Sequence, residues 1–145
     1  MKLKVSSLIA FGIAVLAVVF LIEKNYVISK NPITISIQVL SVGLMIWARI
    51  TFKRRSFHAA ANPTEGKLVT NGPYRWLRHP IYAALIYFFW ASVISYPFIE
   101  TIIGAIVITA ALFVRMILEE KALTKAYDDY AEYKKRTKRL IPYLF

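Results

Sequence analysis

The sequence contains no cysteine, only five glycines and few acidic residues. Without cysteine the chain has no disulfide, no thiolate metal ligand, no cysteine nucleophile and no site for prenylation or palmitoylation, and we expect no metal centre. No G-x-G motif occurs and no alternation of strands and helices is visible. The glycine-rich loop of a Rossmann-type domain is therefore excluded.

The 145 residues combine strong hydrophobicity with strong basicity. Hydrophobic residues make up 58% of the chain, and 19 Lys and Arg against 8 Asp and Glu give a net charge of +11. A nucleic-acid-binding protein spreads its cations over a soluble face, whereas here they lie between long apolar runs. We therefore expect a membrane protein and no nucleic-acid partner.

Four apolar segments predict an all-α integral membrane protein with four transmembrane helices, at about residues 5–22, 32–50, 80–95 and 98–118. We do not interpret the first run as a cleaved signal peptide, because it is longer than the apolar part of a usual signal peptide and further apolar segments follow it. In the second segment, Gln38, Ser41 and Gly43 suggest contacts with other helices. The third segment is short, and "SYPF" joins it to the fourth, so these two should form a tight helical hairpin.

The distribution of cations predicts the orientation of the chain. Seventeen of the nineteen Lys and Arg residues lie before the first segment, between the second and third, or from Arg115 onward, and only Lys24 and Lys30 lie on the other side. The positive-inside rule therefore places both termini and the central loop, residues 51–79, in the cytoplasm.

The C-terminal segment, residues 119–145, shows helical spacing of apolar residues with charged residues between them. We expect an amphipathic helix and tail on the cytoplasmic interface of a single domain, residues 1–145. The run "KKRTKR" would bind anionic membrane lipids, with each cation contributing on the order of 1 kcal/mol.

Polar residues gather where the third segment begins, in "NGPYRWLRHP". Arg78 and His79 precede Pro80, and the free N–H groups of a helix start favour an anionic group such as a ligand carboxylate. In the fourth segment Arg115 and Glu119 share one helical face, and Glu120 is turned about 100° away. Taken singly, these residues also fit interfacial anchors, a helix cap and a structural ion pair.

Together the motifs carry a resemblance. "GKLVTNGPYRWLRHPIY", then "RMILEEKAL", then "YAEYKKRTKRLIP" resemble the C-terminal core of the isoprenylcysteine carboxyl methyltransferase and phospholipid methyltransferase superfamily. The resemblance covers about residues 66–143. It implies an integral membrane methyltransferase that uses S-adenosylmethionine without a Rossmann domain.

The resemblance also implies a site on the cytoplasmic side. Residues expected to line the cofactor pocket are Leu68, Val69, Tyr74, His79, Tyr82 and Glu119. Arg115 corresponds to an arginine near the methyl acceptor, and Glu120 completes the acidic pair. Arg115, Glu120 and His79 are thus the expected catalytic residues.

The acceptor is left open. A lipid or lipophilic carboxylate would need only orientation by Arg115, whereas an amine or hydroxyl must lose a proton to His79 or Glu120. Two other functions compete with methyl transfer: a small four-helix exporter acting as a dimer, and a non-catalytic membrane scaffold. An exporter should carry an ionisable residue deep in its bundle, but Glu100 lies near one end of its segment. The oligomeric state is also open.

Overall fold

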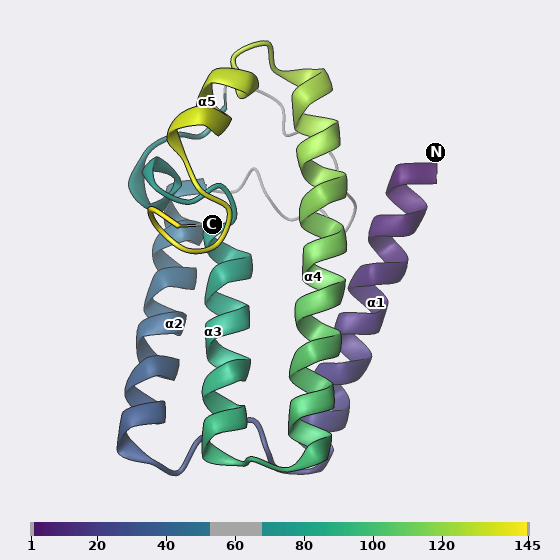
Figure 1. Ribbon diagram of the computed structural model, residues 1–145, viewed down its shortest axis with the longest axis vertical. Helices are drawn as coiled ribbons and strands as arrows, with labels where there is room; N and C mark the ends of the chain where they lie inside the picture. The colour runs from purple at the N-terminus through teal and green to yellow at the C-terminus, as the bar shows by residue number, and fades with distance from the viewer. Residues whose placement is uncertain (1, 53–67, 145) are drawn as a thin grey trace.

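The computed structural model describes residues 2–52 and 68–144. They form five α-helices and a short 3₁₀ helix (Figure 1): α1 (Lys2–Glu23), α2 (Pro32–Phe52), η2 (Gly72–Arg75), α3 (Pro80–Ser95), α4 (Ile99–Ala126) and α5 (Tyr130–Arg136). These ranges contain no strand, only an isolated parallel bridge between Leu77 and Lys138. The expected all-α class is confirmed. Most of the expected cofactor-binding loop, residues 53–67, lies outside the described residues.

Three helices are long and apolar enough to cross a membrane: α1, α2 and α4. The fourth, α3, has 16 residues, which corresponds to a length of about 24 Å at the α-helical rise. Large apolar side chains on α1 and α2 point outward; Leu16 is 70% exposed and Leu40 is 73% exposed. Such faces suit lipid and not water, and they indicate an integral membrane protein.

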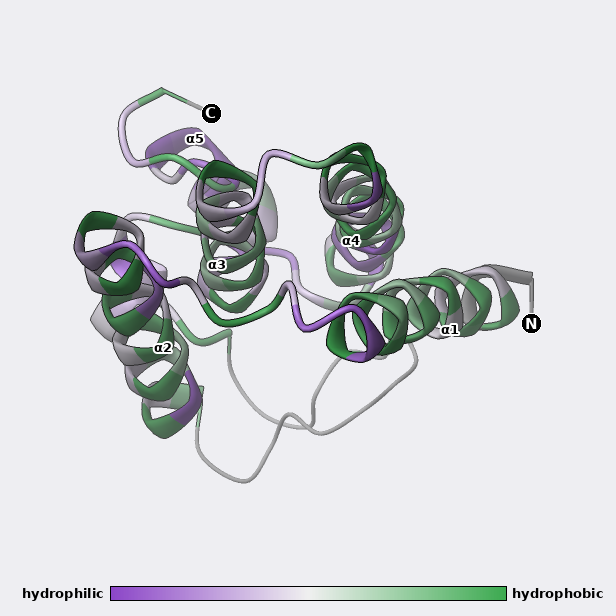
Figure 2. Cartoon of the chain, turned by 90° about the horizontal axis from the view of Figure 1, so that it is seen from below, coloured by the Kyte–Doolittle hydropathy of each residue, from purple (hydrophilic) through white to green (hydrophobic). Residues whose placement is uncertain are grey.

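The helices pack in pairs. Viewed along the bundle, α2 lies beside α3 and α1 lies beside α4 (Figure 2), and these two pairs share more contacts than α3 shares with α4. Gly104 allows the close approach of α1 and α4, because a Cβ atom there would lie 2.9 Å from Leu21 Cδ2. Small residues at a helix interface are the usual means of close packing in membranes.

One end of the bundle carries residues 24–31 and 96–98, and we call it the turn end. There the Gln38 side chain accepts from Ser29 N at 3.0 Å and donates to Val27 O at 2.7 Å and Ser92 Oγ at 3.0 Å. Gln38 and Ser41 are buried as expected. The expectation for Gly43 is wrong, because a Cβ atom there would meet open space.

Helix α4 is longer than the sequence pattern indicated. Instead of stopping near Leu118, α4 continues to Ala126, and the separate helix α5 follows. The extension consists of good helix formers with no glycine or proline, so nothing interrupts the hydrogen-bond ladder. As a result Glu119 and Glu120 lie on the same rigid helix as Arg115.

Candidate active site

The bundle end opposite the turn end, which we call the α5 end, brings the two polar motifs together. His79 is the N-cap of α3, and Pro80 occupies the first helical position, where its missing N–H is tolerated. Two turns of α4 carry Arg115, Glu119 and Glu120 to the same level. The expected residues His79, Tyr82, Arg115, Glu119 and Glu120 therefore meet, although about forty positions separate the motifs.

Tyr82, Arg115 and Glu119 form the first part of this cluster. The Tyr82 hydroxyl donates to Glu119 Oε1 and accepts from Arg115 Nε at 3.1 Å. Arg115 Nη2 donates to the same Oε1 at 3.1 Å. The other oxygen, Glu119 Oε2, makes no hydrogen bond to the described residues, and the Glu119 side chain is 23% exposed. One oxygen is thus held in place while the other remains available.

The first helix also contributes to this cluster. Arg115 Nη1 donates to the Ser7 carbonyl at 3.3 Å, and the guanidinium lies 5.2 Å from the centre of the Phe11 ring. The Ser7 hydroxyl is buried with no hydrogen-bond partner among the described residues. Sequence reasoning missed Ser7 and Phe11, because they lie within an apolar run whose one visible signal is the Ser6–Ser7 pair.

Glu120 is the centre of a second, more enclosed cluster. Its Oε1 accepts from Arg78 Nε at 2.9 Å, and its Oε2 accepts from Arg139 Nη2 at 3.1 Å. Only 6% of its side chain is exposed. A buried carboxylate requires such partners, because desolvation without them costs several kcal/mol. Arg139 was expected to face lipid headgroups, but its guanidinium turns inward, and hydrogen bonding to Glu120 raises the pKa of Arg139.

His79 lies between the two carboxylates. Its Nδ1 is 3.8 Å from Glu119 Oε2, and its Nε2 is 3.4 Å from Glu120 Oε1. The imidazole stacks in parallel on the Tyr82 ring, with the ring centres 5.6 Å apart. Nε2 is buried and makes no hydrogen bond to the described residues. It faces the Glu120 carboxylate at ion-pair distance instead.

The C-terminal tail holds the loop ahead of α3 in place. Arg78 N donates to Lys138 O at 2.7 Å, Lys138 N donates to Trp76 O at 3.0 Å, and His79 N donates to Arg139 O at 3.2 Å. These main-chain bonds fix the backbone on both sides of Arg78. The tail is therefore part of the site's framework, a role that the amphipathic pattern did not reveal.

The remaining expected cofactor residues lie on the approach to α3. Tyr74, in η2, is buried against the Phe52 ring with centres 5.3 Å apart, and its carbonyl accepts from the Tyr133 hydroxyl at 2.7 Å. Burial raises the pKa of both tyrosines, so their hydroxyls stay neutral. Leu68 and Val69 are half-buried just before η2. Their part in a cofactor pocket stays a prediction.

Comparison with known proteins agrees with the motifs. The family model for phospholipid methyltransferases matches residues 33–130. Methanethiol S-methyltransferase 1 of Bradyrhizobium diazoefficiens is 38% identical over 71 residues, which cover 48% of this chain and 24% of that protein. The chain thus aligns with about a quarter of the relative's length. No solved structure gives a significant match.

Proposed function

This chain belongs to the phospholipid methyltransferase family, and we propose that it transfers a methyl group from S-adenosylmethionine to a lipid or lipophilic acceptor at the cytoplasmic membrane face. The observation that carries the proposal is the half-open carboxylate of Glu119. Tyr82 and Arg115 hold one of its oxygens, and the other is directed toward His79.

The proposal includes a topology of four membrane-spanning helices with both termini in the cytoplasm. Three helices meet the length for a span, and the 16-residue α3 would cross with its ends in the interface. Lys24 and Lys30 lie at the turn end, whereas the α5 end carries most of the cations. The charge bias therefore favours a site that opens to the cytoplasm.

The residues of the site fit S-adenosylmethionine. The free oxygen of Glu119 suits its cationic groups, and the first N–H groups of α3, which begins directly after His79, suit its carboxylate. Tyr82 or Tyr74 would offer aromatic surface to the adenine. When bound, the cofactor supplies a methyl group that its sulfonium sulfur has already activated.

Arg115 would orient the acceptor. The residue is 4% exposed and its guanidinium is held by Glu119, Tyr82 and Ser7, so its direction is fixed before any acceptor arrives. For a carboxylate acceptor no base is required, and orientation together with electrostatic stabilisation supplies the acceleration.

An acceptor with a proton to lose needs a base, and we assign this role to His79. Its imidazole would take the proton, and Glu120 Oε1, 3.4 Å from Nε2, would face the positive charge that forms. Glu120 is the weaker candidate, because Arg78 and Arg139 occupy its oxygens and would have to be displaced. We propose that Glu120 instead keeps His79 and the tail in position.

A small thiol is a second candidate acceptor. It is suggested by the methanethiol S-methyltransferase of Bradyrhizobium diazoefficiens, whose similarity covers about half of this chain. A thiol also has a proton to lose, so this acceptor would use His79 in the same way. Assays with prenylated carboxylates, phosphatidylethanolamine and methanethiol would separate the three acceptor chemistries.

Cofactor binding tests the proposal first. We would titrate the protein, purified in a neutral detergent, with S-adenosylmethionine and with its demethylated product by calorimetry. We expect saturable binding that weakens more than tenfold in Glu119→Gln and in His79→Ala. Glu100→Gln, which removes a carboxylate from the first turn of the same helix, is the matched control and should bind normally.

The result also decides between the competing functions. A folded wild-type protein that binds neither compound would remove the methyltransferase proposal. An exporter should show proton-coupled efflux that Glu100→Gln abolishes. A scaffold should show neither efflux nor cofactor binding. Membership in a methyltransferase family does not favour either alternative.

A further inference from the structure

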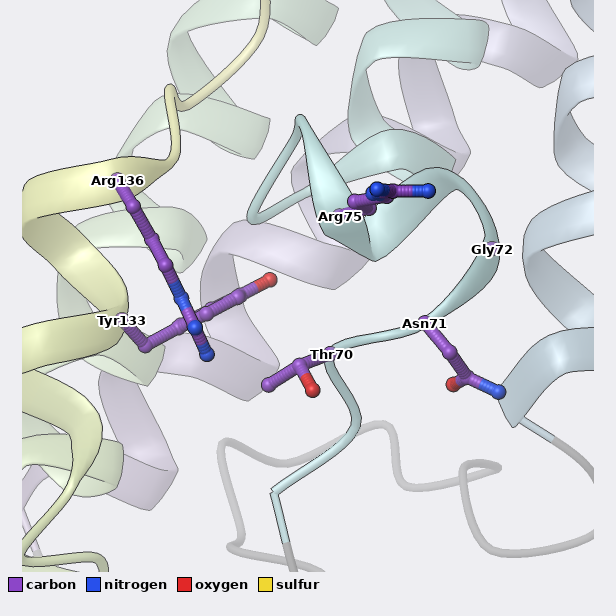
Figure 3. A pocket seen from close by; sticks show the side chains of 6 residues that line it. All are labelled: Thr70, Asn71, Gly72, Arg75, Tyr133 and Arg136. Carbon is purple, nitrogen blue, oxygen red and sulfur yellow. The ribbon is translucent and has the colours of Figure 1, made fainter.

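An open pocket lies outside the His79–Glu119 cluster, between η2 and α5 (Figure 3). Its volume is about 490 Å³, and its lining residues are Thr70, Asn71, Gly72, Arg75, Tyr133 and Arg136. Tyr133 and Arg136 extend from α5 toward the segment that carries Thr70, and Arg75 comes from η2. We propose that this pocket binds a phosphate group, with Arg75 and Arg136 as its two cationic partners.

The charge of the pocket is uncompensated. The described residues include no carboxylate in an ion pair with Arg75 or Arg136, although the same end of the molecule pairs Arg78, Arg115 and Arg139 with glutamates. Arg75 and Arg136 lie instead near aromatic rings, 5.8 Å from the centre of Trp76 and 5.9 Å from that of Tyr133. These contacts steady the side chains and leave their hydrogen-bond donors available.

The lining suits phosphate better than a carboxylate. Two guanidinium groups from different elements can approach different oxygens of a tetrahedral anion, each with a fork of N–H donors. The Thr70 hydroxyl and the Asn71 amide add neutral donors on the same wall. Among the described residues no acidic side chain lines the pocket, so none of them repels a dianionic group from within.

The turn that carries Asn71 and Gly72 forms one wall of the pocket and packs closely against α2. Gly72 adopts φ +55°, and a Cβ atom there would lie 2.4 Å from Thr51 Oγ1, so the turn around Asn71 requires glycine. The opposite wall is anchored by the Tyr133 hydroxyl, which donates to Tyr74 O at 2.7 Å. The two walls that carry the exposed Arg75 and Arg136 side chains therefore have a fixed backbone.

Two sources could supply the phosphate: the headgroup of an anionic phospholipid, or a soluble phosphate ester. We would titrate the detergent-purified full chain with dihexanoylphosphatidylglycerol and, separately, with glycerol 1-phosphate, by calorimetry. Binding of the lipid alone would identify a headgroup site, and comparable binding of both would identify a site for the phosphate itself. Either result supports the proposal, provided that the affinity falls more than tenfold in the Arg75→Gln/Arg136→Gln variant.

The matched control is Lys121→Gln/Lys125→Gln, which removes the same charge from exposed positions on α4 outside the pocket. An equal loss in this variant would show a general charge effect and overturn the proposal, as would the absence of binding by the wild-type protein. S-adenosylmethionine titrations of the same samples keep this test separate from the proposed function, because Arg75 and Arg136 are not among the residues assigned to the cofactor.

Discussion

The two ends of the helical bundle both bury polar side chains, but with different chemistry. At the turn end, Gln38 and Ser92 form a neutral network in which the hydroxyl and both amide atoms are hydrogen-bonded. At the α5 end, the cluster is charged, Glu119 keeps one oxygen available, and His79 lies between two carboxylates without a hydrogen bond at Nε2 to the described residues.

The difference separates a structural network from a candidate site. A satisfied neutral network joins α2 to α3 and leaves nothing to bind a ligand. A charged cluster with unused acceptors and donors is more costly to bury, so its presence indicates that something other than stability maintains it. Four substitutions test this contrast, ordered from the largest expected effect to the smallest.

Removing the buried carboxylate of the α5 end should have the largest effect on stability. We expect Glu120→Ala to lower the free energy of unfolding by about 3–5 kcal/mol, because it leaves Arg78 and Arg139 without their counter-ion. Denaturant titration in mixed micelles measures this loss. Glu132→Ala, which removes an exposed carboxylate paired only with Lys135, should leave the transition unchanged; an equally small loss for both variants would contradict the structural role of Glu120.

Arg115→Lys should slow methyl transfer while the fold persists. A lysine keeps the charge but cannot contact Tyr82, Glu119 and Ser7 at once, so we expect a loss of about 100-fold in rate, or about 2.7 kcal/mol of transition-state stabilisation. Single-turnover assays at saturating cofactor measure this step. A near-normal rate would show that the guanidinium fork does not orient the acceptor.

A substitution at the turn end should lower stability and leave activity unchanged. Gln38→Leu removes one member of the neutral network and leaves Ser29 N without its acceptor, whereas the Ser92 hydroxyl still donates to Val27 O, so we expect a destabilisation of about 1–3 kcal/mol. Cofactor affinity and turnover, measured below the melting temperature, should equal those of the wild-type protein. A loss of affinity here would remove the distinction between the two ends.

Gly72→Ala should have the smallest of the four effects, about 1–2 kcal/mol, from the positive φ and the short contact with Thr51. Thermal melting in detergent measures it. Gly43→Ala is the control on α2, where a Cβ atom meets open space, and it should be neutral or slightly stabilising.

Much of the fold could be predicted from local pattern. Four of the five α-helices were placed to within a few residues, except for the C-terminal end of α4. The features that placed them are the lengths of the apolar runs, Pro32 and Pro80 at helix starts, and the turn at "SYPF". The α4 extension was missed because apolar run length marks where a membrane segment ends, whereas a helix continues until its backbone is interrupted.

The candidate site could be predicted only in part. His79, Tyr82, Arg115 and Glu119 were recognised because their two motifs occur together in the sequence. Arg139 could not be assigned, since a cation in the run "KKRTKR" looks the same whether it faces water or a buried carboxylate. Ser7 and Phe11 could not be assigned either, because the Ser6–Ser7 pair gives no partner and the pairing of α1 with α4 is not visible in either helix alone.

The sequence by itself determined the helices, the membrane character, the bias of charge toward one end and the candidate motifs, because hydrophobicity, helix caps and charge act over a few neighbouring residues. Only the tertiary structure decided the different fates of Glu119 and Glu120. They are adjacent on one helix, but Tyr82 of α3 borders the first, and Arg78 and the tail enclose the second. Their burial and partners depend on segments far away in the chain, so no local pattern could tell the available carboxylate from the enclosed one.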